Sequence, residues 1–344
     1  MKLDAWPVPE LAARIVGFID ASLAGQPHEP IEGLLLDVHT FQVAHDPVLA
    51  ALVEAPVAVW TDIPAVPVAL YKDLPVGSAP ADAPVRFHTS GTTGTGRGEH
   101  RLRATDLYDH GAIAWARHML GQPPGDVVAL LHDPAIDPTS SLAHMVARFV
   151  AFGPPARVTW HVVDGVVDRA GLEARIRAAT GPLFVATTAF ALADWLEADP
   201  SPLPPGSILM TTGGFKGHKV RFDEASLLDH AQARLHPAQI VLEYGMTELS
   251  SQLWAGRGQP YAPPPWLRIV AVDPWTGAPK AVGQEGQLRF YDLCNLDGPL
   301  GVETMDRGIV HADGRLTLLG RLTDAPARGC SLTVEEAWAR RGGR

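Results

Sequence analysis

Residues 88–98 read HTSGTTGTGRG, a run of glycines and small hydroxyl side chains with one arginine near its end. The apolar stretch VRF at 85–87 precedes the run, and a segment with a helical pattern follows it at 105–120. Glycine at this density lets the backbone approach another group closely, and the neighbouring hydroxyls and amides are hydrogen-bond donors. The run is therefore predicted to bind a ligand, and a nucleotide phosphate is the first expectation.

The chain around this run alternates between strand and helix patterns. Strands are expected at 126–132, 156–163, 182–188, 207–214 and 238–245, and helices at 9–24, 105–120, 140–152, 168–179, 189–198 and 223–235. This alternation is typical of an α/β fold whose mainly parallel sheet is covered by helices on both faces. Ligands of such sheets bind beyond the carboxyl ends of the strands, where the segments 89–98, 211–217 and 244–248 are expected.

Beyond residue 266 the sequence changes to short strands separated by turn residues. HADGRL at 311–316 is a hairpin signal, because Asp-Gly stands between two apolar runs. A proline cluster at 260–265 marks the transition into this part, and prolines between 56 and 84 are expected to divide that region into short extended pieces. We predict one large domain over 1–320, with its β-rich part at 266–320.

Composition excludes several classes of protein. The 344 residues are 46% hydrophobic and 19% charged, as in a soluble globular protein, and the net charge of −10 argues against nucleic-acid or anionic-membrane binding. The two cysteines, Cys294 and Cys330, form neither a disulfide framework nor a zinc-site spacing. No signal-peptide core and no membrane span are expected, so we predict a cytoplasmic enzyme.

Three ligand-binding interpretations of the glycine run compete, in addition to that of a flexible loop. A Walker loop requires Lys and then Ser or Thr, but Arg97 and Gly98 stand there. A dinucleotide-binding GxGxxG motif requires a third glycine where the chain has Glu99. A merely flexible surface loop does not account for so many adjacent hydroxyls. The third interpretation needs other segments of the chain.

Four segments in register resemble one enzyme family. TSGTTG at 89–94, continued to Gly98, resembles the phosphate-binding loop of the adenylate-forming superfamily, which contains acyl-CoA synthetases and luciferases. TTGGFKG at 211–217, EYGMTE at 243–248 and DRGIVHADGRLTLLGRLTD at 306–324 resemble its later motifs. The resemblance implies the α/β fold of the adenylate-forming large domain: two α/β layers with mainly parallel sheets plus a small β-rich part. It also implies ATP and Mg²⁺ as cofactors.

The chemistry of that family suits the glycine run. A carboxylate is a poor electrophile, and attack of its oxygen on the α-phosphate of ATP converts it into an acyl-adenylate. The protein must hold two anions in line and neutralise charge as pyrophosphate leaves. Backbone N–H groups and hydroxyls of the run suit the β- and γ-phosphates. The residues expected to bind them are Thr89, Ser90, Gly91, Thr92, Thr93 and Gly94.

The resemblance assigns the rest of the nucleotide to later motifs. It implies that Tyr244 stacks on adenine, that Thr247 donates to the α-phosphate, and that Glu248 holds Mg²⁺. Each residue taken alone has a structural alternative, such as a helix-cap carboxylate for Glu248. The same ATP site is expected to include Gly213, Gly214, Gly245 and Met246.

Two residues are expected at the ribose. The resemblance implies that Asp306 accepts from the ribose hydroxyls and that Arg321, in the Gly-Arg hinge, reaches the ribose or a phosphate. Asp306 could alternatively be a turn residue. The stretch 130–145 occupies the region where the family lines its acyl pocket. The candidates there are His132, Ser140, Ser141 and His144, of which His144 is equally well explained by packing.

The C-terminal part departs from the ordinary pattern of the family. The family carries a further domain with a catalytic lysine, whereas here we expect the segment 321–344 to form a hinge and a short arm, and no lysine follows Lys280 in this sequence. Either the adenylation step proceeds without that lysine, or Arg97 or another cation replaces part of its role.

Cys330 lies in this arm, just before a helical pattern with a Thr333–Glu336 capping box. This arrangement resembles the LuxE-type acyl-protein synthetases, which adenylate a fatty acid, transfer the acyl group to their own cysteine and pass it to a reductase. A thiolate is a good nucleophile toward an acyl-adenylate. Arg328 and the helix N-terminus would lower the thiol pKa, and Glu335 and Glu336 would oppose this. Cys330 could alternatively be a packing residue. Cys294 is expected to be core.

The sequence therefore predicts an ATP-dependent acyl-protein synthetase that activates a carboxylic acid, with fatty acids expected. Thr247, Arg321, Arg97 and Cys330 are its expected catalytic residues, and a LuxC-like reductase or another thiol acceptor is the expected partner. Two alternatives stay open. One is an acyl-CoA ligase of the phenylacetate type, in which Cys330 is structural. The other is a non-catalytic subunit that binds ATP or an acyl-adenylate.

Overall fold

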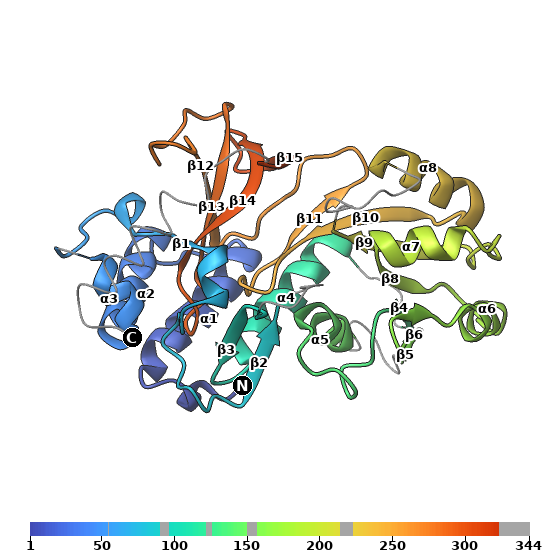
Figure 1. The fold of residues 1–344 in the computed structure, drawn as a ribbon, viewed down its shortest axis with the longest axis horizontal. Helices are drawn as coiled ribbons and strands as arrows, with labels where there is room; N and C mark the ends of the chain where they lie inside the picture. Colours follow the sequence, from blue (N-terminus) through green and yellow to red (C-terminus); the bar gives the residue numbers. More distant parts are fainter. Residues whose placement is uncertain (54, 90–95, 122–125, 150–156, 214–222, 323–344) are drawn as a thin grey trace. The chain divides into compact units, whose positions relative to one another are not determined.

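The computed structural model describes residues 1–53, 55–89, 96–121, 126–149, 157–213 and 223–322. The chain forms two compact units. Unit 1 combines Met1–Ala114, Met246–Ser251 and the residues from Ala262 on, and unit 2 combines Trp115–Gly245 with Gln252–Tyr261. Each unit is built around its own sheet, and the sequence motifs are divided between them (Figure 1).

Unit 2 holds a six-stranded, mainly parallel sheet. Its order is β11-β10-β9-β8-β4-β5, and only β11 is antiparallel to its neighbour. The strands are β4 (Val127–Leu130), β5 (Val158–Trp160), β8 (Phe184–Thr188), β9 (Ile208–Thr212), β10 (Gln239–Tyr244) and β11 (Leu253–Gly256). The helices are α5 (Ser141–Arg148), α6 (Arg169–Arg177), α7 (Ala189–Leu196), α8 (Glu224–Leu235) and the end of α4 (Asp106–Leu120). The predicted alternation of strands and helices is confirmed.

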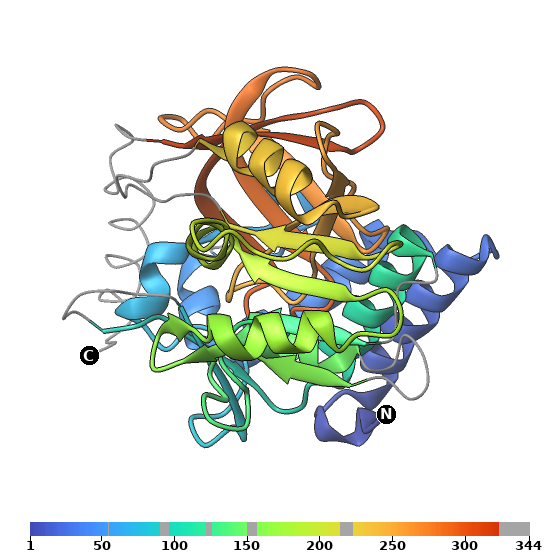
Figure 2. The same ribbon diagram turned by 90° about the vertical axis from the view of Figure 1, so that its right-hand side faces the viewer.

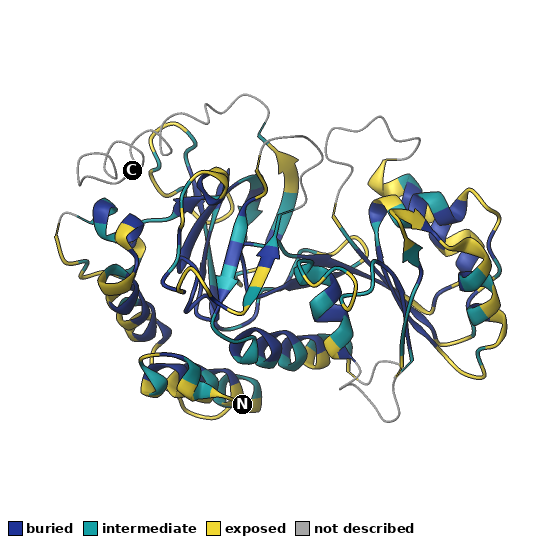
Figure 3. Cartoon of the chain, turned by 60° about the horizontal axis from the view of Figure 1, so that its bottom comes forward, coloured by how far each residue is buried: buried dark blue, intermediate teal, exposed yellow. Residues whose placement is uncertain are grey.

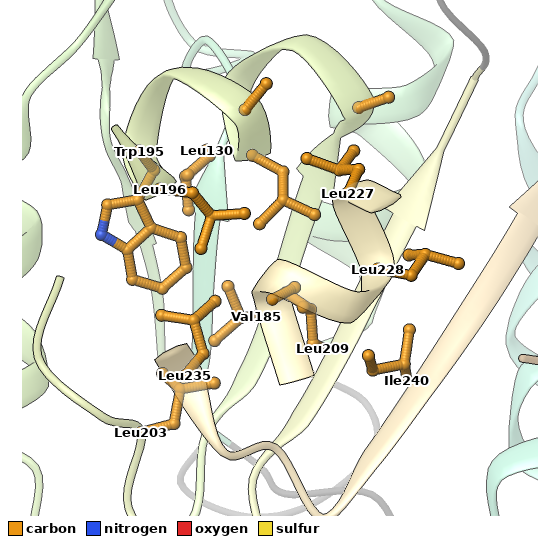
Figure 4. Close-up of a cluster of buried hydrophobic side chains, with 14 of the residues drawn as sticks. Leu130, Val185, Trp195, Leu196, Leu203, Leu209, Leu227, Leu228, Leu235 and Ile240 are labelled. Atoms are coloured by element: carbon orange, nitrogen blue, oxygen red, sulfur yellow. The ribbon is translucent and has the colours of Figure 1, made fainter. Parts of the chain in front are cut away.

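The helices α6, α7 and α8 cover one face of this sheet, in front of the strands in the view of Figure 2. Every second strand residue, such as Val185 and Leu209, packs against this layer, where Trp195 of α7 is fully buried (Figure 4). Each large apolar side chain buried in this way contributes roughly 1.5–3 kcal/mol. The three helices begin at side chains that accept hydrogen bonds from the first turn: Asp168, Thr188 and Asp223.

The opposite face of the sheet carries the alternate strand residues. Phe184 of β8 meets Phe149, which follows α5, with ring centroids 5.4 Å apart at 84°. Phe149 also meets Trp254 of β11 at 6.2 Å. Both faces are therefore covered, and the strands are almost entirely buried while the helices keep exposed outer faces (Figure 3).

The prediction of one strand over 156–163 is wrong. β5 ends at Trp160, and Val162–Val163 (β6) pairs instead with Val166–Val167 (β7) as a separate antiparallel hairpin. Its turn is Asp164–Gly165, with φ of 48° and 80°. Asp-Gly favours this two-residue turn because both positions require positive φ, and the turn signal prevails over the apolar run before it.

Unit 1 contains a five-stranded, mainly antiparallel sheet in the order β1-β14-β13-β12, with β15 paired to β14. Its strands are β1 (Val66–Pro67), β12 (Leu267–Val272), β13 (Glu285–Asp292), β14 (Gly301–Val310) and β15 (Leu316–Arg321). The predicted hairpin between β14 and β15 is confirmed, and its Gly314 has φ +81°. Among the described sheets, only that of unit 2 is mainly parallel.

The N-terminal part of unit 1 is helical. It comprises η1 (Leu3–Ala5), α1 (Pro9–Ala24), α2 (Ile31–His45), α3 (Pro47–Leu52), η2 (Trp60–Asp62) and η3 (Val68–Lys72). We expected only extended pieces between 56 and 84, but the structure forms the 3₁₀ turns η2 and η3 there. A proline fits directly before such a turn, as Pro67 does before η3. Within the described residues, no helix combines the length and the apolar character needed to cross a membrane.

A two-stranded hairpin completes unit 1. β2 (Val85–His88) pairs antiparallel with β3 (Glu99–Leu102), so that Phe87 lies opposite His100 and His88 opposite Glu99. The glycine run therefore joins the two strands of a hairpin. In the same unit, the first part of α4 packs against Cys294, since a Cβ added at Gly111 would lie 3.1 Å from the Cys294 Sγ. Cys294 is buried, as expected for a core cysteine.

Candidate active site

The ends of the glycine run are closed by two hydrogen bonds. Thr89 N donates to the Gly98 carbonyl and Gly98 N donates to Thr89 Oγ1, both at 2.9 Å. A Cβ at Gly98 would lie 3.1 Å from Thr89 Cγ2 and from Tyr71 Cβ, so the close approach favours glycine. Arg97 beside it is exposed. The other predicted loop residues, Ser90, Gly91, Thr92, Thr93 and Gly94, lie outside the described part of the chain.

Thr247 is hydrogen-bonded to the same hairpin through two of its atoms. Its Oγ1 donates to the His88 carbonyl at 3.3 Å, and its own carbonyl lies 2.7 Å from His100 Nδ1. A carbonyl oxygen only accepts, so Nδ1 of His100 carries the proton. Burial lowers the pKa of His100 to about 4, against the raising effect of this hydrogen bond. The ring is therefore neutral at ordinary pH and acts as a fixed donor.

The chain after Thr247 is irregular and is held by buried polar side chains. Asn295 Nδ2 donates to the Glu248 carbonyl at 2.9 Å, and Asn295 Oδ1 accepts from Ser250 N at 2.8 Å. Asp292, at the end of β13, accepts from Ser251 N at 2.8 Å and from Ser251 Oγ at 2.7 Å. Burial outweighs these hydrogen bonds and raises the pKa of Asp292 to about 6. The segment Thr247–Ser251 is thus positioned by side chains and not by a strand ladder.

Glu248 is the predicted magnesium ligand and is almost fully buried. A carboxylate oxygen suits Mg²⁺, which usually takes one or two protein carboxylates and completes its octahedron with water and phosphate oxygens. Among the described residues, no group of three His, Cys, Asp or Glu side chains could hold a metal alone. A single carboxylate suits Mg²⁺ where phosphate oxygens and water complete the coordination, and Glu248 stays the predicted ligand.

The two predicted ribose residues lie together on the last hairpin. Asp306 and Arg321 face each other across β14 and β15, and Arg321 Nε donates to Asp306 Oδ1 at 3.1 Å. The Asp306 side chain is largely covered, whereas that of Arg321 is half exposed. The structure thus pairs the two residues, and their role at a ribose stays a prediction.

In unit 2 the motif EYGMTE begins on β10. Tyr244 packs edge-to-face against Tyr261, with centroids 5.9 Å apart at 62°. Glu243 points to the other face, where its Oε2 accepts from Thr212 Oγ1 on the neighbouring strand β9. Glu243 is 4% exposed, and burial raises its pKa to about 7. A Cβ at Gly245 would overlap Glu243 Oε1, which explains the glycine after Tyr244.

Other predicted residues occupy ordinary local positions. Gly213 directly follows β9 with φ +75°, a conformation that favours glycine, and Gly214 lies outside the described residues. Ser140 is the N-cap of α5, where its Oγ accepts from Ala143 N at 3.1 Å. The acyl-pocket candidates are all half-buried: His132, Ser140, Ser141 and His144. Met246 accepts a backbone hydrogen bond from Leu249 N at 3.2 Å.

The sequence did not reveal four residues that position the motifs: His100, Asp292 and Asn295 in unit 1, and Glu243 in unit 2. Glu243 stood inside the recognised EYGMTE motif, and burial of that strand was a usable signal. His100 followed the glycine run by two positions, but its partner Thr247 is 147 residues away in the chain. Asp292 ends β13 and Asn295 follows it three residues later, and neither stands in a recognised catalytic motif. Cys330 and the arm at 323–344 lie outside the described residues, so their predicted role stays a prediction.

The fold is that of the adenylate-forming enzymes, as the sequence resemblance predicted. O-Succinylbenzoate coenzyme A synthetase from Bacillus subtilis, in complex with AMP, matches with a TM-score of 0.51 and 17% identity over 70% of this chain and 49% of that chain. ATP-bound MatB from Rhodopseudomonas palustris matches with a TM-score of 0.50 and 16% identity over 69% and 47%. The chain thus spans about half the length of these solved structures.

One curated relative matches part of the sequence. It is the long-chain-fatty-acid–luciferin-component ligase of Vibrio harveyi, 26% identical over 38% of this chain and 37% of that protein. No family model matches the chain. The predicted resemblance to the adenylate-forming fold and to a long-chain fatty-acid ligase is therefore confirmed, and activity and substrate are matters of proposal.

Proposed function

We propose that this protein activates a carboxylic acid with ATP by forming an acyl-adenylate. The observation that carries the proposal is the attachment of Thr247, and with it Glu248, to the hairpin that holds the glycine run. A hydroxyl donor and a metal-binding carboxylate therefore stand in one unit with a loop suited to phosphates. The adenylate-forming fold supports the same conclusion.

In the proposed reaction a carboxylate oxygen of the acid attacks the α-phosphorus of ATP. One phosphorus–oxygen bond forms to the acid, the bond to the β-phosphate oxygen breaks, and pyrophosphate leaves with the electron pair. The glycine run holds the β- and γ-phosphates, Thr247 donates to the α-phosphate, and Asp306 with Arg321 orients the ribose. Mg²⁺, held by Glu248, would neutralise charge on the leaving pyrophosphate. Arg97, in the glycine run, is proposed as a cation that stabilises charge on the phosphates.

The second proposed step transfers the acyl group to Cys330. The Cys330 thiolate attacks the acyl carbon, a thioester forms, and AMP leaves, so the protein gains the mass of the acid minus water. The partial match to a long-chain fatty-acid ligase supports fatty acids as substrates. A reductase of the LuxC type is the proposed final acceptor. A coenzyme A ligase is the second candidate, because the B. subtilis structure is a coenzyme A synthetase with the same fold.

The test is intact-mass measurement after incubation with Mg-ATP and a panel of fatty and aryl acids. We expect a mass gain equal to the acid minus water on the wild type but not on Cys330→Ala. Cys294→Ala, which removes the other cysteine, is the matched control and should carry the adduct. AMP and pyrophosphate without an adduct would reject the Cys330 step, and acid-dependent coenzyme A thioester would favour the ligase. Absence of acid-dependent pyrophosphate exchange would reject adenylation itself and leave the non-catalytic subunit.

A further inference from the structure

The bonds between Thr247 and the β2–β3 hairpin have unequal lengths. The Thr247 hydroxyl lies 3.3 Å from the His88 carbonyl, beyond the 2.5–3.0 Å usual for an O–H···O hydrogen bond. The Thr247 carbonyl lies 2.7 Å from His100 Nδ1, at the short end of the range for a nitrogen donor. The main chain of Thr247 is therefore held firmly, while its hydroxyl is held weakly.

We propose that His100 is a positioning residue for adenylation: it anchors the Thr247 carbonyl to the glycine-loop hairpin while the Thr247 hydroxyl exchanges His88 for the nucleotide. The inference rests on the proposed function, in which that hydroxyl donates to the α-phosphate. A hydroxyl with one hydrogen can serve only one strong acceptor at a time, so binding the phosphate costs the bond to His88. The bond from His100 then remains as the link between Thr247 and the hairpin.

The surroundings of His100 fix the ring in this orientation. The side chain is 2% exposed, and Tyr71 packs edge-on against it at 6.4 Å and 85°. A Cβ at Gly298 would lie 2.5 Å from His100 Nε2, so glycine at 298 leaves the room that the ring occupies. The Gly298 carbonyl is itself held at 2.6 Å by Gln42 Nε2. Nε2 of His100 has no hydrogen-bond partner among the described residues, so the one bond that the ring makes is that to Thr247.

His100 also connects the two parts of the proposed phosphate site through the backbone of one hairpin. β3 begins at Glu99, directly after Gly98, which closes the glycine run with Thr89. A displacement of Thr247 from His100 would therefore change the distance between the donor for the α-phosphate and the loop for the β- and γ-phosphates. The expected consequence is weaker ATP binding and slower adenylation, with little effect on the affinity for the acid.

The test compares His100→Ala, His100→Asn and His39→Ala in the full chain. Asn carries an N–H donor near the position of Nδ1, whereas Ala carries none, and His39 is a similarly buried histidine of unit 1 on α2. Acid-dependent pyrophosphate exchange gives kcat and KM for ATP and for the acid. We expect His100→Ala to lose about tenfold or more in kcat/KM for ATP, the size of one lost buried hydrogen bond, and His100→Asn to recover most of it.

A second measurement does not depend on activity. Nitrogen-15 NMR of the histidine rings should show His100 as the neutral tautomer with the proton on Nδ1. The Nε2–H tautomer, or equal losses in His100→Asn, His100→Ala and His39→Ala, would overturn the inference. A wild type that shows no acid-dependent exchange would reject the proposed function and the inference together, whereas an active wild type with the wrong tautomer would reject the inference alone.

Discussion

Two stretches of EYGMTE are held in place by different physical means. Glu243 and Tyr244 stand on a central strand of unit 2, whose ladder and apolar faces fix them. Thr247 and Glu248 stand on an irregular segment of unit 1, whose backbone groups are satisfied by buried His100, Asn295 and Asp292. The first half depends on packing, which tolerates conservative change. The second half depends on individual hydrogen bonds, each of which leaves an unpaired buried group when it is lost.

The largest expected effect is on the packed half. Trp195→Ala removes a fully buried indole from the layer between the unit 2 sheet and its helices, and should lower the free energy of unfolding by about 3–5 kcal/mol. Phe190→Ala on the same helix is the control, since Phe190 is 41% exposed and should cost about 1 kcal/mol or less. Urea unfolding measures both. Equal losses would contradict a core centred on Trp195.

The next effect concerns the hydrogen-bonded half. Asp292→Ala leaves the amides of Ser250 and Ser251 and the Ser251 hydroxyl without this acceptor, and should cost about 2–4 kcal/mol. Asp292→Asn keeps one acceptor oxygen, so its free energy of unfolding should fall by less than half of the amount lost in Asp292→Ala. If packing alone held this segment, the two variants would unfold at the same urea concentration.

The smallest change in the free energy of unfolding, near zero at pH 5, is expected for Glu243→Gln. The folded protein raises the pKa of Glu243 from 4.5 to about 7, so between these values the folded state binds more protons than the unfolded state. Stability contributed by the neutral carboxyl is therefore present below pH 4.5 and lost as the pH rises through 7. The amide of the variant stays neutral and still accepts from Thr212, so the variant should become more stable than the wild type toward pH 8.

Thermal melts from pH 5 to pH 8 check this prediction. A difference that stays constant across this range would show that the folded protein does not raise the pKa of Glu243. Glu197→Gln, on the same unit but exposed, is the matched control and should show no growing difference.

The sequence predicted the sheet of unit 2 well because its strands are buried on both faces and read as apolar runs between helical patterns. It missed α2, whose buried residues include Leu34, Leu35, Val38 and Phe41. Burial on more than one side of this helix removes the one-sided periodicity on which recognition depends. It also missed the β2–β3 hairpin, because short strands of mixed polarity carry little signal.

The candidate site was predictable where a motif is local and not where contacts are distant. Thr247, Glu248, Asp306 and Arg321 stood in recognised segments, and the structure pairs the last two across a hairpin. His100 and Asn295 act through partners 147 and 47 residues away. Such contacts follow from the fold and have no counterpart in spacing along the chain.

The pairing of β1 with β14 has a consequence for synthesis on the ribosome. Val66 lies beside Val302 and Pro67 beside Glu303. At about 5–20 residues per second, the N-terminal strand waits on the order of ten seconds or more for its partner to be made. Unit 2 lies wholly between these two strands in the chain and completes its sheet first. The parallel sheet therefore emerges as a nascent folding unit, while the hairpin with the glycine run stays without its remaining neighbours until late in translation.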